Sequence, residues 1–398
     1  MKVIPHGVRK QIAEWRQTIV NELSADTVGG ISEGNDVQVY FDGDRVYEVM
    51  LQAISSAKAF VHLEMYMFLS DDIGRIFAKA LSKKAREGMQ VRVIFDSIGS
   101  SEADMMQWAD MRDAGVEVIE YRPAGFWTGL WGKRGGIIGR NHRKNLIVDG
   151  EIGFTGGMNI GNSWSQEFSR EDAWRDTQMR IAGPAVKHLN MLFIDSWGHA
   201  TDETLTCLPT ELVNQGNSRC LVIGSEGLGS RKQIRQLFSV HLNKARKSVK
   251  MTIPYFVPPK RLRKSMQRAA DRGVNISILV PRDSDVTVVD WLREGLYPNL
   301  LSWGVRVIEY LGPVLHAKTM VVDDSIAVIG SNNFDILSVL MNRETAIVVF
   351  DDDVAEELEL QWKNDLMLSD RVANDWEGIR PWWRLWMAKI GCFLLRRL

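Results

Sequence analysis

A pattern of histidine, lysine, aspartate and asparagine occurs twice in this chain with the same internal spacing. Each copy reads His-x-Lys-x4-Asp, and in each the asparagine follows the histidine by 17 positions. One such copy would be a weak signal, whereas two copies in register indicate an internal duplication. The first copy consists of His142, Lys144, Asp149 and Asn159, and the second consists of His316, Lys318, Asp323 and Asn333.

Strands and helices are predicted to alternate around both copies. The apolar run 59–67 is typical of a strand buried on both faces, and one helix is expected over 286–302. Segments 115–121 and 304–310 repeat the order Gly-Val-x-Val-Ile-Glu-Tyr. We therefore expect an α/β fold, a duplicated α/β/α sandwich whose two halves are related by a pseudo-two-fold axis and share one active site.

The duplication predicts how the chain is divided. With 398 residues the chain is long enough for two domains, each with a sizeable core. We expect an N-terminal helical extension over 1–34, a first half over 35–205, a second half over 206–370 and a basic, tryptophan-rich tail over 371–398.

Composition excludes some classes of protein. The net charge of −1 gives no general attraction to polyanions, so no nucleic-acid partner is expected. The three cysteines are scattered and odd in number, which argues against a disulfide framework and against a metal knuckle. The N-terminal region has no apolar run long enough for a signal peptide or a membrane span.

The duplicated residues suit the double displacement of a phosphodiester. One neutral imidazole attacks phosphorus and forms a phosphohistidine, while the other protonates the leaving alcohol and later deprotonates the incoming one. The lysines and asparagines would hold the non-bridging oxygens as charge develops. Backbone amides at 156–157 and 330–331 are further candidate donors. This chemistry needs neither a metal nor a cofactor.

Four carboxylates accompany the two histidines. Asp176 and Glu344 occupy matching places after the two motifs, and each is a candidate to orient an imidazole; the alternative is a surface salt bridge. Asp149 and Asp323 end the motif strands, where we expect them to bind backbone or structural partners.

Two segments have the composition of a lipid contact. An aromatic loop over 124–135, with lysine and arginine beside its tryptophans, is inserted before the first motif. In the tail over 381–398, apolar residues share one helical face, and basic residues lie mostly opposite, as in a helix at an anionic membrane surface. The alternatives are a loop folded over the cleft and a helix covering apolar core or a partner subunit. The apolar residues are Trp383, Trp386, Met387, Ile390 and Leu394, and the basic ones are Arg384, Lys389 and Arg396.

These motifs resemble those of the phospholipase D superfamily, and further segments resemble the bacterial cardiolipin synthases. The similarity extends over roughly residues 35–365. The segments that carry it, besides the two motifs, are 63–68 (Leu-Glu-Met-Tyr-Met-Phe), 156–161 (Gly-Gly-Met-Asn-Ile-Gly), 174–177 (Trp-Arg-Asp-Thr), 183–186 (Gly-Pro-Ala-Val), 254–259 (Pro-Tyr-Phe-Val-Pro-Pro) and 330–335 (Gly-Ser-Asn-Asn-Phe-Asp).

The resemblance implies a metal-free reaction that joins two phosphatidylglycerols into cardiolipin and releases glycerol. It implies that His142 is the nucleophile and His316 the acid and base. It also implies that each histidine is paired with the carboxylate of the other half, so that Glu344 orients His142 and Asp176 orients His316.

The chain departs from many cardiolipin synthases in two ways. It lacks the two N-terminal membrane spans with which many of them begin, so it is similar to the shorter group. We accordingly expect a peripheral protein on the cytoplasmic face of a bacterial inner membrane, attached through the loop and the tail. Leu337 stands where many relatives have arginine, which leaves the acceptor open.

Several alternatives share these residues. A hydrolysing phospholipase D and a phosphatidylserine synthase differ from a cardiolipin synthase only in the acceptor. A nuclease of the same superfamily and a non-catalytic membrane scaffold are more remote readings. The sequence leaves the oligomeric state open.

Overall fold

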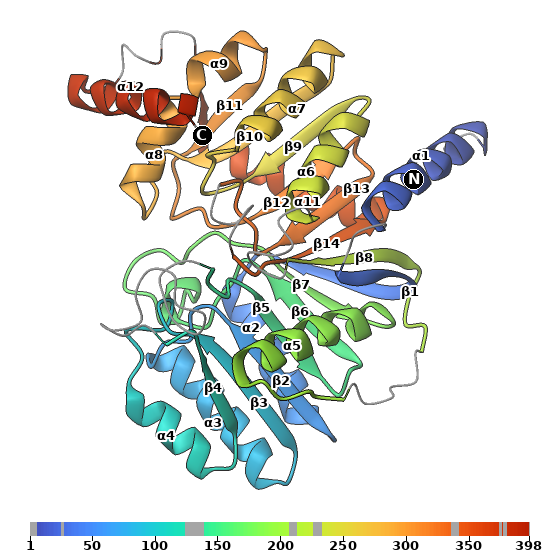
Figure 1. The fold of residues 1–398 in the computed structure, drawn as a ribbon, viewed down its shortest axis with the longest axis vertical. Helices are drawn as coiled ribbons and strands as arrows, with labels where there is room; N and C mark the ends of the chain where they lie inside the picture. The colour runs from blue at the N-terminus through green and yellow to red at the C-terminus, as the bar shows by residue number, and fades with distance from the viewer. Residues whose placement is uncertain are drawn as a thin grey trace.

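The first half of the chain alternates strands and helices (Figure 1). The computed structural model describes residues 6–24, 28–123, 139–206, 213–225, 233–335, 342–373, 376 and 380–397. The elements up to residue 201 are α1 (His6–Ser24), β1 (Val28–Tyr40), α2 (Gly43–Ser56), β2 (Phe60–Met65), α3 (Asp72–Arg86), β3 (Gln90–Asp96), α4 (Met105–Asp113), β4 (Glu117–Tyr121), β5 (Lys144–Val148), β6 (Ile152–Gly156), η1 (Asn162–Trp164), β7 (Gln178–Ala182) and α5 (Ala185–Thr201).

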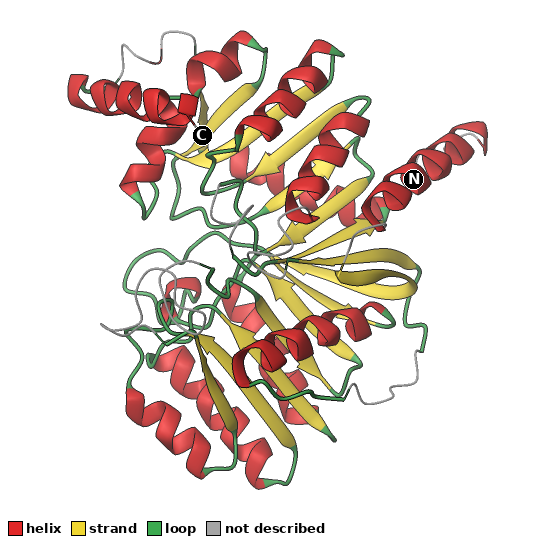
Figure 2. Ribbon diagram, viewed as in Figure 1, coloured by secondary structure: helices red, strands yellow, loops and turns green. Residues whose placement is uncertain are grey.

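The second half repeats this order and adds elements at its end. Figure 2 distinguishes the helices and strands of both halves by colour. Its elements are β8 (Ser218–Gly224), α6 (Gln233–Lys244), β9 (Ser248–Thr252), α7 (Lys260–Asp271), β10 (Asn275–Pro281), α8 (Thr287–Glu294), α9 (Tyr297–Ser302), β11 (Arg306–Tyr310), β12 (Thr319–Val322), β13 (Ile326–Gly330), β14 (Thr345–Phe350), α11 (Asp352–Leu366), β15 (Ser369–Arg371) and α12 (Trp382–Arg397).

One continuous 15-stranded sheet runs through both halves. Its order is β15-β11-β10-β9-β12-β13-β14-β8-β1-β7-β6-β5-β2-β3-β4, which, apart from β15, places equivalent strands at equal distances from the centre. At the centre β1 pairs antiparallel with β8 through its first residues and with β7 through its last. This order confirms the predicted duplication about a pseudo-two-fold axis. The predicted boundary at residue 35 falls inside β1, and the one at 206 lies between α5 and β8.

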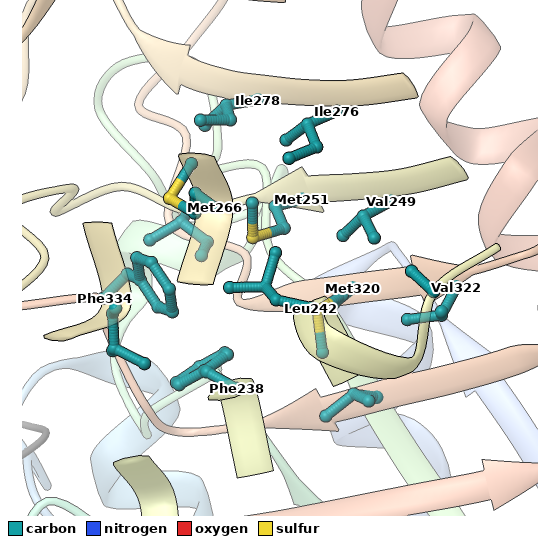
Figure 3. Packing of buried hydrophobic residues seen from close by; sticks show 14 of the residues in the cluster. Phe238, Leu242, Val249, Met251, Met266, Ile276, Ile278, Met320, Val322 and Phe334 are labelled. Carbon is teal, nitrogen blue, oxygen red and sulfur yellow. The ribbon is translucent and has the colours of Figure 1, made fainter. Parts of the chain in front are cut away.

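Helices cover both faces of the sheet and create three main hydrophobic clusters. In the second half, α1, α6 and α7 pack on one face, where Phe238, Leu242 and Met266 meet strand residues such as Met251 (Figure 3). In the first half, α2, α3 and α4 cover the corresponding face. On the other face, α5 and α11 pack on one cluster with residues from both halves, among them Ile147 and Ile347. The three layers confirm the predicted α/β/α sandwich.

One predicted helix is two helices in the structure. The expected helix over 286–302 breaks after Glu294, and α9 starts again at Tyr297 with Pro298 in its first turn. Proline lacks a backbone N–H and its ring clashes with the preceding turn, so it is tolerated at the start of a helix but not inside one. The prediction of a single helix is therefore wrong.

Helix α12 packs against α8 and is tied to it by ion pairs. The guanidinium of Arg384 lies 2.8 Å from a carboxylate oxygen of Glu294 and 2.7 Å from one of Asp283, and Ala388 is buried. The exposed side of the helix carries Trp382 and Trp386. The charge of Arg384 is thus matched by carboxylates of the protein, contrary to the expectation that it would attract anionic lipid.

Candidate active site

Each motif histidine precedes a central strand and is bound by the backbone of the other half. The backbone N–H of His142, before β5, donates to the carbonyl of Arg343 at 2.9 Å, and that of His316, before β12, donates to the carbonyl of Arg175 at 2.8 Å. In both cases the accepting residue immediately precedes a candidate carboxylate. The same exchange, made twice, brings the two motifs to the junction of the halves.

The carboxylates cross between the halves in the same way. Nδ1 of His142 lies 3.1 Å from Glu344 Oε2, and Nδ1 of His316 lies 2.7 Å from Asp176 Oδ2. All four side chains are buried. A carboxylate at Nδ1 fixes the proton there, so Nε2 of each ring is the atom left for chemistry. The structure thus brings together the pairs that the resemblance implied, and neither carboxylate is a surface ion pair.

Burial keeps both imidazoles neutral. Burial, together with the nearby charge of Lys318, lowers the pKa of His316 to about 4, against the opposing effect of Asp176. Burial also lowers the pKa of His142, against the opposing charge of Glu344. Each ring therefore offers an Nε2 lone pair at neutral pH, as an attacking nitrogen requires.

The two motif lysines are buried beside the histidines. Nζ of Lys144 donates to the carbonyl of His142 at 2.8 Å, and Nζ of Lys318 donates to that of His316. Burial and the neighbouring charge of Lys318 together lower the pKa of Lys144 to about 7. Burial lowers the pKa of Lys318 to about 8. An anion bound between the two ammonium groups would relieve their repulsion.

The two motif asparagines are buried and differ in their contacts. Oδ1 of Asn159 accepts from the backbone N–H of Met67 at 3.1 Å, so its amide nitrogen is the group left to donate. Oδ1 of Asn333 has no hydrogen-bond partner among the described residues. Both side chains are available to an oxyanion through their NH₂ groups.

The predicted backbone donors are otherwise engaged. The amide of Gly157 donates to the carbonyl of Thr177, and the amide of Ser331 donates to that of Thr345, both at 2.9 Å. The amide of Gly330 donates to Lys318 at 3.3 Å. For Gly157, Gly330 and Ser331 the expectation that their amides bind phosphate is wrong, because these amides join the ends of β6 and β13 to the neighbouring strands.

Asp149 and Asp323 lie at the other ends of the motif strands. The carboxylate of Asp149 accepts from the backbone amides of residues 58, 59 and 60, each at 2.8 Å. The carboxylate of Asp323 accepts from the amides of residues 246, 247 and 248 at 2.7–2.8 Å. Both aspartates have positive φ values, 53° and 52°. They bind the backbone, as expected, and fix the start of β2 and β9 against the motif hairpins.

Sequence comparison agrees with this geometry. A profile described as "Cardiolipin synthase, PLD-like domain" matches residues 50–196 and 239–366. The chain belongs to the cardiolipin synthase family. It is 32% identical over 351 residues to a cardiolipin synthase of Clostridium perfringens, covering 86% of this chain and 72% of that one. It is 29% identical over 381 residues to cardiolipin synthase 1 of Staphylococcus aureus, covering 94% and 76%. The family predicted from the motifs is confirmed.

Comparison with solved structures shows that this member of the cardiolipin synthase family has the phospholipase D-type fold. A phosphatidylserine synthase of Haemophilus influenzae superposes with a TM-score of 0.71 at 13% identity, covering 97% of both chains. A polyphosphate kinase of Porphyromonas gingivalis superposes with a TM-score of 0.57 at 13% identity, covering 92% of this chain and 53% of that one. At these identities the likeness shows the fold alone.

Several buried residues of the site were not singled out from the sequence. Arg143, between the motif histidine and lysine, donates to the carbonyls of Glu344, Leu192 and Ser225 at 2.7–3.2 Å. Trp164 donates its indole N–H to Asp176 at 2.9 Å. The ring of Tyr66 lies 4.7 Å from that of His142 and 5.0 Å from Nζ of Lys144. For Arg143 a signal was present, since a charged residue between two motif residues, next to a buried strand, needs internal partners.

Other expected features fall partly outside the described chain. The aromatic loop 124–135 and Leu337 lie outside the described residues. Within the described part, no group of three or more His, Cys, Asp or Glu residues is placed to hold a metal ion. No helix in that part is both long and apolar enough to cross a membrane.

Proposed function

We propose that this protein is a cardiolipin synthase that transfers a phosphatidyl group from one phosphatidylglycerol to another. In the first step, Nε2 of His142 attacks the phosphorus, and the bond from phosphorus to the glycerol oxygen breaks. His316, which takes up a proton at Nε2 when the phosphate anion binds beside it, gives that proton to the departing oxygen, so free glycerol leaves and a phosphatidyl-histidine remains. The assignment of His142 as nucleophile follows the family resemblance.

The second step reverses the first with a different alcohol. The terminal hydroxyl of a second phosphatidylglycerol attacks the phosphohistidine, and its proton passes to His316. The bond from phosphorus to His142 breaks, which regenerates the free imidazole and gives cardiolipin. The arriving phosphate anion offsets the burial that lowers the pKa of His316, and Asp176 supports the resulting imidazolium.

The lysines and asparagines of both motifs would stabilise the transition state. The ammonium groups of Lys144 and Lys318 are buried, where a charge interacts more strongly with phosphate than it would in water. Each is held by the carbonyl of its own motif histidine. The position of each ammonium group is therefore coupled to the backbone position of its own motif histidine.

The observation that carries this proposal is the reciprocal pairing of His142 with Glu344 and of His316 with Asp176. A site with two oriented Nε2 atoms and two buried ammonium groups suits phosphoryl transfer through a histidine. A hydrolase would use the same groups with water as the acceptor, so the products decide between the two.

The experiment incubates purified protein with phosphatidylglycerol in mixed micelles containing chelator and identifies products by mass spectrometry. We expect cardiolipin and glycerol in equal amounts. Phosphatidic acid and glycerol without cardiolipin would replace the synthase with a hydrolase. No turnover by the unsubstituted protein would contradict both, and the His142→Ala variant provides the blank.

We also infer that the protein is peripheral to a bacterial inner membrane, on its cytoplasmic face, and that α12 lies at the lipid surface. Trp382 and Trp386 are 80% and 61% exposed, and tryptophan favours the boundary between lipid and water. Deleting the helix would leave the buried carboxylate of Glu294 without Arg384, so substitution is the cleaner test.

Replacing Trp382 and Trp386 by serine should weaken binding to phosphatidylglycerol vesicles by about tenfold. The control replaces Leu360 and Met367, which are 60% and 77% exposed on another part of the surface. Co-sedimentation with vesicles measures both. Equal losses in the two variants would mean that exposed apolar area alone, and not α12, attaches the protein.

A further inference from the structure

A groove between α6 and α7 collects positive charge away from the reaction centre. It encloses about 380 Å³ and is lined by Arg235 of α6 and by Arg261, Lys264 and Arg268 of α7. The hydroxyl-bearing residues Ser239 and Ser265 also line it, and no carboxylate does. The groove therefore presents cations and neutral donors only.

Among the residues that the structure describes, no carboxylate neutralises the charges of this groove. In the part of the chain that the structure describes, none of the four basic side chains forms an ion pair with Asp or Glu, whereas Lys247 and Arg282 do. Burial lowers the pKa of Arg235, and the neighbouring Arg261 lowers it further. Arg235 is half-buried and Arg261 is exposed, and two guanidinium groups that repel each other cost stability unless an anion joins them.

Another groove between helices, in the first half, is balanced. A groove of about 580 Å³ between α3 and α4 is lined by Arg75, Lys79 and Arg86 and also by the carboxylates of residues 104, 110 and 113. Its cations and carboxylates are equal in number. An excess of positive charge is therefore a property of the α6–α7 groove and not of interhelical grooves in this fold.

A short segment of the chain joins the groove to the reaction centre. Helix α7 starts at Lys260, five residues after Tyr255. The ring of Tyr255 lies 6.5 Å from that of His316.

We propose that the groove between α6 and α7 binds the phosphate of an anionic phospholipid at a site separate from the reaction centre. Guanidinium groups bind phosphate oxygens through paired N–H donors, and an ammonium adds a point charge. A phosphate between Arg235 and Arg261 replaces their repulsion by two attractions. The choice of a lipid phosphate over a soluble one rests on the proposed function.

The first test compares two charge-matched double variants in the His142→Ala background. Lys264 and Arg268 precede Gly273 by nine and five positions, and Lys79 and Lys83 precede Gly88 by the same numbers; both glycines have positive φ after their helices. Replacing Lys264 and Arg268 by glutamine should weaken binding to phosphatidylcholine vesicles containing phosphatidylglycerol by roughly ten- to thirtyfold. Replacing Lys79 and Lys83 should weaken it by less than about threefold.

Similar losses in both variants, or no loss in the first, would overturn the proposal. Binding of glycerol phosphate to the groove by calorimetry, together with unchanged vesicle binding by the Lys264 and Arg268 variant, would also overturn it, because the ligand would then be soluble. Since His142 is replaced throughout, the outcome does not depend on whether the enzyme makes cardiolipin.

A single variant tests the same site through stability. Arg235→Gln removes the repulsion with Arg261, so it should raise the melting temperature in the absence of lipid while it weakens vesicle binding. A lower melting temperature with unchanged vesicle binding would assign Arg235 a structural role and contradict the proposal.

Discussion

The two halves share a backbone frame but hold their carboxylates with different donors. In both, an aspartate at the end of the motif hairpin accepts from three consecutive amides. Asp176, however, accepts the indole N–H of Trp164 at 2.9 Å, whereas Glu344 accepts the hydroxyl of Ser331. The two halves therefore share the contacts that hold the motif hairpin to the backbone, but they differ in the side chains around each imidazole.

This difference suits two histidines with different tasks. The ring of His316 lies 5.7 Å from that of Trp164 and 5.5 Å from that of Trp174. The ring of His142 instead lies 4.7 Å from that of Tyr66, and the ring of Tyr66 lies 5.0 Å from the ammonium group of Lys144. Two imidazoles in unequal surroundings titrate apart, which is what a nucleophile and an acid in one site require.

The largest expected effect distinguishes the two histidines. His142→Ala should lower kcat by at least about 10⁴-fold with every substrate, because the covalent intermediate cannot form. His316→Ala should lose as much with phosphatidylglycerol but far less with a nitrophenyl phosphodiester, whose leaving group needs no proton. Initial rates measure both. The opposite pattern would exchange the two roles.

The crossed carboxylates should give the next largest effect. Asp176→Asn should lower kcat with phosphatidylglycerol by about 10³-fold, since His316 loses the charge that supports its imidazolium. Much of this loss should disappear with the nitrophenyl substrate, whereas the loss in Glu344→Gln should persist because attack itself is impaired. Equal losses with both substrates in both variants would mean that the two carboxylates do the same work.

The lysines predict the shape of the pH profile. Burial lowers the pKa of Lys144 to about 7 and that of Lys318 to about 8, so rising pH removes positive charge from the free enzyme. We expect kcat/KM to fall with rising pH from about pH 7, and more steeply above pH ~8, because each lysine that loses its proton no longer attracts the phosphate. Rates with a soluble phosphodiester measure this. An increase of kcat/KM from pH 8 to 10 would contradict it.

The smallest effects concern stability. A Cβ on Gly157 would lie 2.1 Å from Oδ1 of Asp176, so Gly157→Ala should lower the free energy of unfolding by about 2–3 kcal/mol. Ser331→Ala removes only a hydroxyl that donates to Glu344 and should cost about 1–2 kcal/mol. Denaturant titration measures both. A larger loss at Ser331 would mean that the second half holds its carboxylate more tightly than the first.

The sequence predicted the parts of the site that local spacing determines. The motif strands, their order and the positions of His142 and His316 follow from two registered copies, and the family resemblance supplied the exchange of Asp176 and Glu344. The break before Pro298 could also have been predicted, because proline inside a helix violates a local rule. The expected single helix over 286–302 ignored that rule.

The remaining features depend on pairings between distant residues. The amides of Gly157 and Ser331 are consumed by the carbonyls of Thr177 and Thr345 on the neighbouring strands. Arg384 meets Glu294, which is 90 positions away in the chain. No pattern in the sequence near these residues indicates such partners, because they are set by sheet order and by how α12 packs.

Strand β1 limits how the enzyme can adapt to larger headgroups. It pairs with β8 at one end and with β7 at the other, so this one strand belongs to both halves. A rotation of one half against the other that moved the imidazoles apart would have to break main-chain hydrogen bonds at the centre of the sheet. The separation of the two imidazoles is accordingly fixed by the sheet. Side chains around the site then determine which alcohols fit.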